Sequence, residues 1–337
     1  MNLQIILETF FITKITMNNI ERLNQRFAKD YNLPINIFSE EMFNYYANLY
    51  DFFPKDVYNS LLDKVNNEYG GNVDKWLEYC AEVRDRAIST ITKSEEWKRF
   101  NAEDMGKYSL HPTVGEHSCY TWVTVGKAFL SIDLRKANFQ ALKYAGVLKD
   151  KTYGDFIERM GGDDYIKNSK YLRQVIFGKM NPSRQITVEK YMIQSVADYL
   201  GPYLDKENFH LFSMNSDELL YEVKDFDKVT EDFTSSIEDR IADKLGIEVK
   251  AESIGINKLA IENPRGNYVD AYERINLQTK ETTLKKASAT FFPQIYKIWK
   301  NKEIEERDRV FFFEDQLATF NEPLRETQII PIDVGLN

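Results

Sequence analysis

Two carboxylate-bearing segments, separated by about eighty residues, are the strongest candidates for chemistry in this sequence. In residues 128–142 an apolar run ends at Asp133, and in residues 210–223 a turn-favouring Asn-Ser pair precedes Asp217 and Glu218. Carboxylates brought together in pairs can hold two divalent ions roughly 3.5–4 Å apart, an arrangement suited to phosphoryl transfer. The residue types therefore predict a metal-assisted phosphoryl-transfer site, provided that the two segments meet.

The elements around these acids are of the kind that would bring them together. Residues 128–134 read as a short buried strand that leads into a helix, and residues 210–223 read as strand, tight turn and strand. If these strands are neighbours in a sheet, Asp133 and Asp217 converge on one edge. A purely structural interpretation is also sound, because Asp is a good helix cap and a good turn residue.

Between the two acidic segments lies the most basic window of an otherwise acidic chain. From 165 to 190 a single acid, Glu189, stands among six basic residues: Lys167, Lys170, Arg173, Lys179, Arg184 and Lys190. Lys and Arg neutralise phosphate charge, so a basic segment beside a carboxylate site is what a nucleoside triphosphate requires. The alternative is a solvated helix face.

The periodicity of the remaining sequence predicts an α+β fold. Residues 1–120 read as a mainly helical N-terminal region, 121–246 as a core of strands with packed helices, and 247–337 as a smaller α+β region. Within the core, a helix capped by Thr187 and ended by Gly201 is expected. After 246 the pattern changes to strands, with a hairpin between 268 and 287, before a helix that opens at Pro293.

Two histidines and a thiol gather in the stretch His111 to Cys119, which also contains His117. A structural zinc site needs a fourth ligand, and the remaining candidates, Cys80 and His210, are distant in sequence. We therefore interpret this stretch as a loop with hydrogen-bonded histidines.

The composition argues against several classes of protein. The chain has 337 residues, 43% of them hydrophobic, and a net charge of −9, which argues against a basic nucleic-acid coat but leaves room for a local basic channel. Two cysteines are too few for a disulfide framework and favour a reducing compartment. No run reaches the roughly 20 apolar residues of a membrane span, so we expect a cytoplasmic protein without a membrane partner.

The order of these segments resembles motifs A, B and C of the polymerase palm superfamily, most closely family B DNA polymerases. Asp133-Leu-Arg-Lys-Ala-Asn-Phe-Gln-Ala resembles motif A, and Asn215-Ser-Asp-Glu before Leu-Leu-Tyr-Glu-Val resembles motif C with its first Asp replaced by Asn. Lys179-Met-Asn-Pro-Ser183 resembles motif B in compressed spacing. The Asp-Glu pair is also similar to that of family A polymerases. The resemblance covers roughly 100 residues and implies that 121–246 form a palm-like core of antiparallel sheet with packed helices.

The resemblance implies a template-dependent nucleotidyltransferase that joins a nucleoside triphosphate to a 3′-hydroxyl on a primer-template. In that case Asp133 and Asp217 hold Mg²⁺, with Mn²⁺ as the alternative ion, and Glu218 assists them. The residues implied in nucleotide binding are Arg173, Lys179, Arg184 and Asn138. Asn138 stands where such polymerases place a bulky side chain against a ribose 2′-hydroxyl, so the resemblance leaves the sugar preference open.

The chain departs from a full-length polymerase in ways that keep other interpretations open. The segment before Asp133 is too short for a 3′–5′ exonuclease domain, which implies a reduced polymerase, such as that of a virus in the host cytoplasm or of a mobile element. A non-catalytic interaction or structural protein that keeps the palm and binds a protein partner is favoured by the acidic charge and by Asn215. A metal-dependent nuclease would use the same acids with water as the nucleophile.

Overall fold

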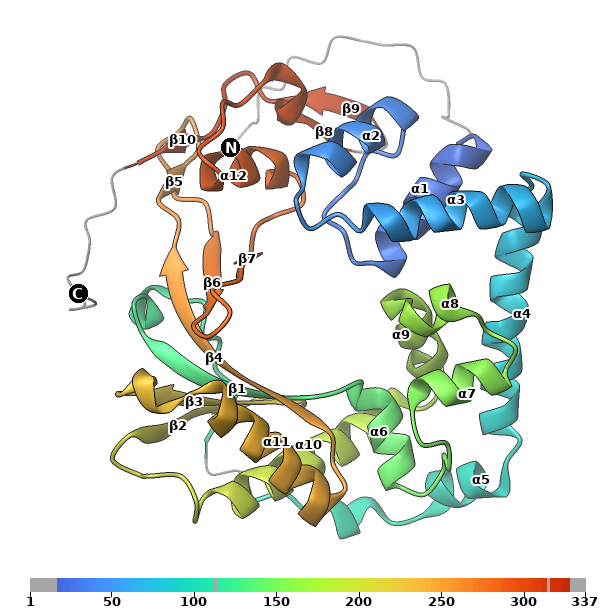
Figure 1. The fold of residues 1–337 in the computed structure, drawn as a ribbon, viewed down its shortest axis with the longest axis vertical. Helices are drawn as coiled ribbons and strands as arrows, with labels where there is room; N and C mark the ends of the chain where they lie inside the picture. The colour runs from blue at the N-terminus through green and yellow to red at the C-terminus, as the bar shows by residue number, and fades with distance from the viewer. Residues whose placement is uncertain (1–16, 112–113, 314–315, 328–337) are drawn as a thin grey trace. The chain divides into compact units, whose positions relative to one another are not determined.

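The computed structural model describes residues 17–111, 114–313 and 316–327. It confirms the α+β class, with helices at the N-terminal end and an antiparallel sheet (Figure 1). The described residues belong to two compact units: unit 1 draws on those within 1–79, 260–270 and 287–328, and unit 2 on those within 80–259 and 271–286. The segment after 246 contributes to both units.

Unit 2 is built on a six-stranded sheet in which every neighbouring pair is antiparallel. The strands follow the order β2-β3-β1-β4-β6-β7. Their bounds are β1 Ala128–Leu134, β2 Phe209–Met214, β3 Glu218–Val223, β4 Val249–Lys258, β6 Tyr272–Asn276 and β7 Thr282–Lys285. The predicted hairpins at 210–223 and 268–287 are formed by β2 with β3 and by β6 with β7.

Alternation along β1 gives the sheet two different faces. Phe129, Ser131 and Asp133 point to one side, which we call the carboxylate face, while Leu130 and Ile132 point to the other and are fully buried. Part of the carboxylate face is covered by the segment before β1, where Cys119, Tyr120 and Val125 pack on a core cluster of Phe129, Leu220, Ile254, Ile256 and Tyr272. The end of the face that carries Asp133 is left open to solvent.

Helices cover the opposite face. α10 (Pro182–Leu200) contacts β3, and α11 (Glu231–Leu245) contacts β4 (Figure 1). α11 begins at its predicted cap Thr230 and ends at Gly246, which adopts a left-handed conformation. The start predicted for α10 at Thr187 is wrong: Pro182 occupies the first turn, where its missing N–H costs nothing, and extends the helix by more than one turn.

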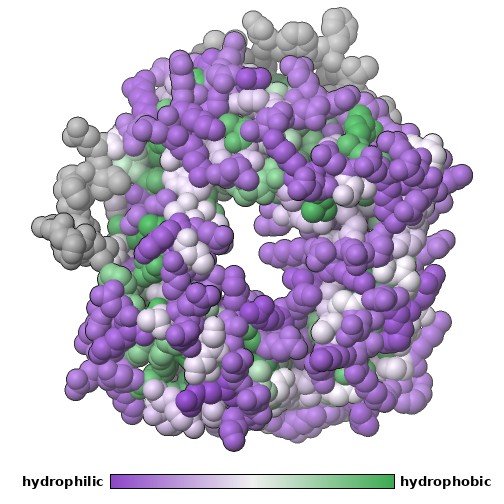
Figure 2. Space-filling view, in the orientation of Figure 1, coloured by the Kyte–Doolittle hydropathy of each residue, from purple (hydrophilic) through white to green (hydrophobic). Residues whose placement is uncertain are grey.

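The other elements of unit 2 surround this core. They are the C-terminal part of α4 (Val73–Thr92), α5 Glu95–Ala102, η1 Met105–Tyr108, η2 Trp122–Thr124, α6 Ala137–Tyr144, α7 Tyr153–Arg159, α8 Asp164–Asn168, α9 Lys170–Gly178 and η3 Phe226–Lys228. Among the helices described, none is long and apolar enough to cross a membrane. On the face shown in Figure 2 hydrophilic residues dominate, and hydrophobic residues form small separate patches.

Unit 1 combines the N-terminal helices with segments from the C-terminal part of the chain. Its elements are α1 Asn19–Asp30, α2 Glu40–Leu49, α3 Lys55–Tyr69, the start of α4, β5 Ile261–Glu262, α12 Phe292–Trp299, η4 Glu306–Arg309, β8 Val310–Phe313, β9 Gln316–Thr319 and β10 Arg325–Glu326. The helix expected at Pro293 is α12, with Pro293 in its first turn.

A buried ion pair and a hydrogen bond connect α12 and η4 with α2 in unit 1. Lys297 of α12 lies 2.8 Å from the carboxylate of Asp308, and both side chains are almost completely buried. Asp308 also accepts a hydrogen bond from the hydroxyl of Tyr45 in α2, and Lys297 lies 2.7 Å from Glu305. Because both charges are buried away from solvent, each depends on the other.

Removing one member of this pair should therefore destabilise unit 1 strongly. Lys297→Met leaves Asp308 buried without its cation, and we expect a loss of about 3–5 kcal/mol in the free energy of unfolding, measured by urea denaturation. The double variant Lys297→Met/Asp308→Asn, which removes both charges, should lose less than Lys297→Met alone. The coupling would be contradicted if the double variant lost as much stability as Lys297→Met alone, or as much as the two single variants together.

Candidate active site

The acids singled out from the sequence meet at one end of the carboxylate face. β1 pairs with β3, in a register that places Asp133 directly opposite Glu218. Asp217 is the residue before β3, and its carbonyl accepts a 2.8 Å hydrogen bond from the N–H of Leu134. The end of β1 is thus fixed to the β2–β3 turn by its backbone, so the three carboxylates cannot separate without unpairing the sheet.

The turn that carries Asp217 is held by its own polar groups. The N–H of Asn215 donates to the carbonyl of Glu218 at 2.9 Å and closes the hairpin. Ser213, at the end of β2, lies 3.3 Å from the Asn215 side chain and accepts a hydrogen bond from the His117 N–H at 2.8 Å. A register shift between Leu211 and Ser213 adjusts β2 to this turn.

Asp133 and Asp217 are open to solvent, and in the part of the chain that the structure describes their carboxylates form no hydrogen bond or ion pair. The pKa of Asp133 is raised to about 7. Loss of hydration beside the surrounding protein makes the largest contribution, and repulsion from Asp217 and Glu218 adds to it. Glu218 is half-buried, and burial raises its pKa although the Ser131 hydroxyl donates to it at 2.6 Å. A site in which negative charges repel each other in this way favours binding of cations.

A further acid, Glu189 of α10, adds to this negative potential. Its side chain is only 5% exposed. Burial, and after it repulsion from Asp217, raises the pKa of Glu189 to about 7. The side-chain amide of Asn138, in the first turn of α6, donates to it at 3.3 Å. Asn138 therefore lies near the acids, as the resemblance implies, but it donates its hydrogen bond to Glu189, whose place at the site was not predicted from the sequence.

Two cations flank Asp133 on the side of α6 and α9. The Lys136 ammonium lies 5.3 Å and the Arg173 guanidinium 5.9 Å from the ring centroid of buried Tyr153. Burial lowers the pKa of both cations, repulsion from Arg173 lowers that of Lys136 further, and attraction to Asp133 partly opposes the shift of Arg173. The Nε atom of Arg173 is buried without a hydrogen-bond partner among the described residues. Lys136 also adopts a left-handed backbone with φ of 51°, a strain often found at functional sites.

A second charged group lies on the other side of the acids, across β4, β6 and β7. Glu252 lies 2.5 Å from Arg274 and 2.7 Å from Lys250. Burial by itself raises the pKa of Glu252, but hydrogen bonds from Lys250 and Arg274 outweigh this effect and lower the pKa overall. Lys285 of β7 is half-buried, and its pKa is lowered by burial and by Arg274. None of these residues was singled out from the sequence, because their convergence depends on the pairing of strands far apart along the chain.

The other predicted nucleotide-binding residues are held elsewhere in unit 2. The Arg184 guanidinium donates to the carbonyls of Phe100 and Glu103 at 2.6 and 2.5 Å and stacks on the Phe100 ring, so it anchors α10 to the α5 region. Lys179 caps the end of α9, is exposed, and acts electrostatically on Asp85. Of the three predicted cations, only Arg173 interacts with an acid of the site.

The cysteines are packed in the protein interior and are poorly placed to bind a metal. Cys119 is buried in the core cluster, and burial raises the pKa of its thiol to about 11, while Cys80 is buried in α4. In the described ranges, no three His, Cys, Asp or Glu side chains are gathered so as to hold a metal by themselves. This is compatible with Mg²⁺ at Asp133 and Asp217, since Mg²⁺ commonly takes one or two carboxylates and completes its shell with waters and substrate phosphates.

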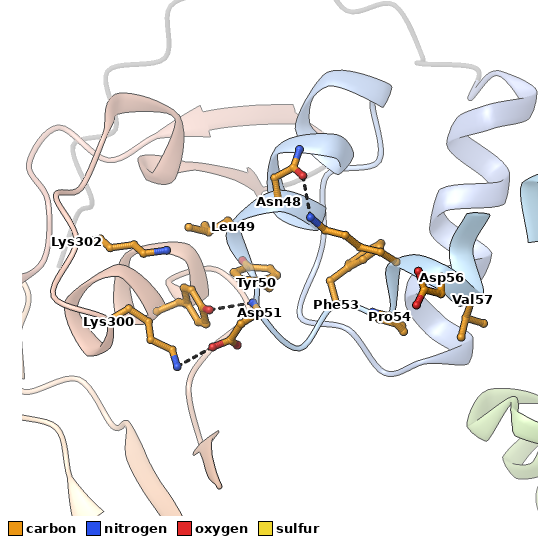
Figure 3. A pocket seen from close by; sticks show the side chains of 12 residues that line it. Asn48, Leu49, Tyr50, Asp51, Phe53, Pro54, Asp56, Val57, Lys300 and Lys302 are labelled. Atoms are coloured by element: carbon orange, nitrogen blue, oxygen red, sulfur yellow. Dashed lines mark hydrogen bonds and ion pairs between the residues drawn. The ribbon is translucent and has the colours of Figure 1, made fainter. Parts of the chain in front are cut away.

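Unit 1 has a pocket of its own, shown in Figure 3. It has a volume of about 750 Å³ and lies between the α2–α3 connection and the end of α12. Lys300 lies 2.7 Å from Asp51, and the hydroxyl of Tyr296 accepts a hydrogen bond from the Asp51 N–H at 3.0 Å. Because its charged groups are largely paired with each other, this pocket is a weaker candidate for catalysis than the carboxylate face.

Comparison with known proteins identifies no relative: no protein-family model, no curated protein and no solved structure matches the chain. We therefore infer the function from the site itself.

The buried position of Glu189 has a measurable consequence for stability. An acid with a raised pKa in the folded state loses stability as pH rises from its unfolded value of 4.5 towards 7, because the unfolded chain releases the proton first. Glu189→Gln removes this penalty and should increase the free energy of unfolding by about 1–3 kcal/mol at pH 8, with little effect at pH 4, below the unfolded pKa of 4.5. Urea denaturation at the two pH values measures this, and Glu207→Gln, on the exposed α10–β2 connection, serves as the control. Equal effects of Glu189→Gln at both pH values would contradict the assignment.

Proposed function

We propose that this protein is a template-dependent nucleotidyltransferase of the DNA polymerase type. The proposal depends mainly on the carboxylates of Asp133 and Asp217. Both are exposed to solvent, form no ion pair among the described residues, and are held close together at the end of β1, next to Glu218. Such a pair has little structural purpose, because neither carboxylate caps a helix or forms an ion pair among the described residues. It has a clear chemical purpose as a cation site.

The neighbouring cations support an anionic substrate. Lys136 and Arg173 have lowered pKa values, and among the described residues neither forms an ion pair with an acid. Both lie near the ring of Tyr153, and Arg173 interacts electrostatically with Asp133. A triphosphate placed between these cations and the metal-binding acids would relieve the repulsion within each group, because phosphate oxygens bind both cationic side chains and Mg²⁺.

The residues present fit a divalent ion. Asp133 and Asp217 would hold Mg²⁺ or Mn²⁺, which when bound would supply charge neutralisation at the reacting phosphate and lower the pKa of the attacking 3′-hydroxyl. Glu218 is held by the Ser131 hydroxyl and would position this pair. Lys136 and Arg173 would orient the triphosphate. Lys179 and Arg184 have no part in this arrangement, and Asn138 acts through its contact with Glu189.

The proposal predicts nucleotide incorporation that depends on both acids. With a primed template, magnesium or manganese, and all four dNTPs or NTPs, the wild-type chain should extend the primer. Asp133→Asn and Asp217→Asn should each lower the rate by at least about 100-fold, because each removes charge stabilisation that acts at the reacting phosphate.

Asp239→Asn on the exposed surface of α11 is the matched control and should retain the wild-type rate. Circular dichroism should show that all three variants fold. No incorporation by the wild-type chain with any nucleotide, or incorporation that survives both active-site substitutions, would overturn the proposal. Degradation of the primer without extension would instead indicate a nuclease.

A further inference from the structure

An exposed aromatic surface lies on η2, in unit 2. Trp122 is 52% exposed and its neighbour Val123 is 77% exposed, which is unusual for side chains of this kind. The Trp122 ring is nevertheless held in place, because the ammonium of Lys258 lies 4.3 Å from its centroid. Lys258 itself is only 4% exposed and lies 4.7 Å from the ring of Tyr272. A fixed ring with half its surface in solvent is well suited to stacking on a flat ligand.

Two lysines at the end of β7 continue this surface. Lys285 stands opposite Tyr272 in the β6–β7 pairing, and the ammonium of Lys286 lies 6.0 Å from the Tyr272 ring. Within the described residues, neither lysine forms an ion pair or a hydrogen bond. We call Trp122, Lys258, Tyr272, Lys285 and Lys286 the Trp122 track.

The Trp122 track leads to the carboxylates. Lys258, Tyr272 and Lys285 occupy paired positions on β4, β6 and β7. Arg274 lies two residues further along β6 on the same face and contacts Glu252 at 2.5 Å. Lys285 is close enough to Glu218 for the two charges to act on each other, and it is also repelled by Lys170 of α9. The surface thus passes from an exposed aromatic ring through a group of positive charges to the acids of the candidate site.

We propose that the Trp122 track binds single-stranded nucleic acid, with a base stacked on Trp122 and backbone phosphates on Lys285 and Lys286, so that the strand ends at Asp133 and Asp217. The inference rests on the proposed function for the identity of the strand as primer or template. Stacking platforms combined with cations are how proteins bind single strands without sequence preference. A docking site for another protein is less well matched, because lysines are depleted from the centres of protein interfaces.

The test is equilibrium binding of fluorescein-labelled oligonucleotides of about 12 nucleotides, within the site size of such surfaces, followed by anisotropy. The full-length chain should bind oligothymidylate more tightly than a blunt duplex of the same length, because only an unpaired base can stack on Trp122. Trp122→Ala should weaken binding about 5- to 150-fold, the range for removal of one stacked base, and Trp122→Phe should retain most of it. Lys285→Ala/Lys286→Ala should reduce the slope of log affinity against log salt by about 0.7 for each phosphate that the lysines no longer neutralise.

Two variants outside the track are the controls: Tyr144→Ala, which removes an exposed aromatic ring from α6, and Lys224→Ala, which removes an exposed lysine just after β3. Both should bind as the wild type does. The inference is overturned if Trp122→Ala binds as tightly as Tyr144→Ala, or if duplex and single strand bind equally well.

The binding assay tests the Trp122 track, and the incorporation assay tests the polymerase proposal, so either proposal can be wrong without the other. Binding that depends on Trp122 without any primer extension would support the track and overturn the polymerase proposal. Primer extension combined with binding that is insensitive to Trp122 and to both lysines would overturn the track and leave the polymerase proposal intact.

Discussion

The central constraint in unit 2 is the position of β1 between β3 and β4. Antiparallel pairing on both sides places Glu218 and Lys250 directly across from Asp133, and the backbone bond from Leu134 to Asp217 joins the turn to the same point. The register cannot slip by one residue, because the fully buried Leu130 and Ile132 would then exchange faces with Ser131 and Asp133. The core therefore forces the acids together despite their repulsion.

This enforced proximity organises the charges around it. The pKa values of Asp133 and Glu189 rise to about 7. A cation bound at this site would therefore compete with protons near neutral pH. The positive side chains lie at the flanks, with Lys136 and Arg173 on one side and Arg274 and Lys285 on the other. An acidic centre between basic flanks is the charge pattern expected for a metal-assisted reaction of a phosphate ester held at both ends.

How much of this could be predicted from the sequence depends on the range of the interactions. The strand before Asp133, the hairpin before Glu218 and the helix from Thr230 to Gly246 follow from local periodicity and turn residues, and the structure contains them all.

The predicted start of α10 was wrong because Thr187 is a good cap in isolation. Lys136 and Glu189 were missed because each becomes significant only through residues brought close by folding, and Arg184 looked available because its carbonyl partners lie about eighty residues earlier. Local patterns define elements, while the contents of the site depend on strand pairing and on packing between helices.

The claim on which the account depends is that Asp133 and Asp217 together form a divalent-cation site. The most direct measurement is Mn²⁺ binding, followed by the loss of the free-ion electron paramagnetic resonance signal at pH 8, with and without a nucleoside triphosphate. The account predicts that the wild-type chain binds Mn²⁺, that Mg²⁺ competes, that nucleotide tightens binding, and that either Asp133→Asn or Asp217→Asn abolishes it. Binding that is unchanged in both variants, or the absence of binding by the wild-type chain with nucleotide present, would contradict it.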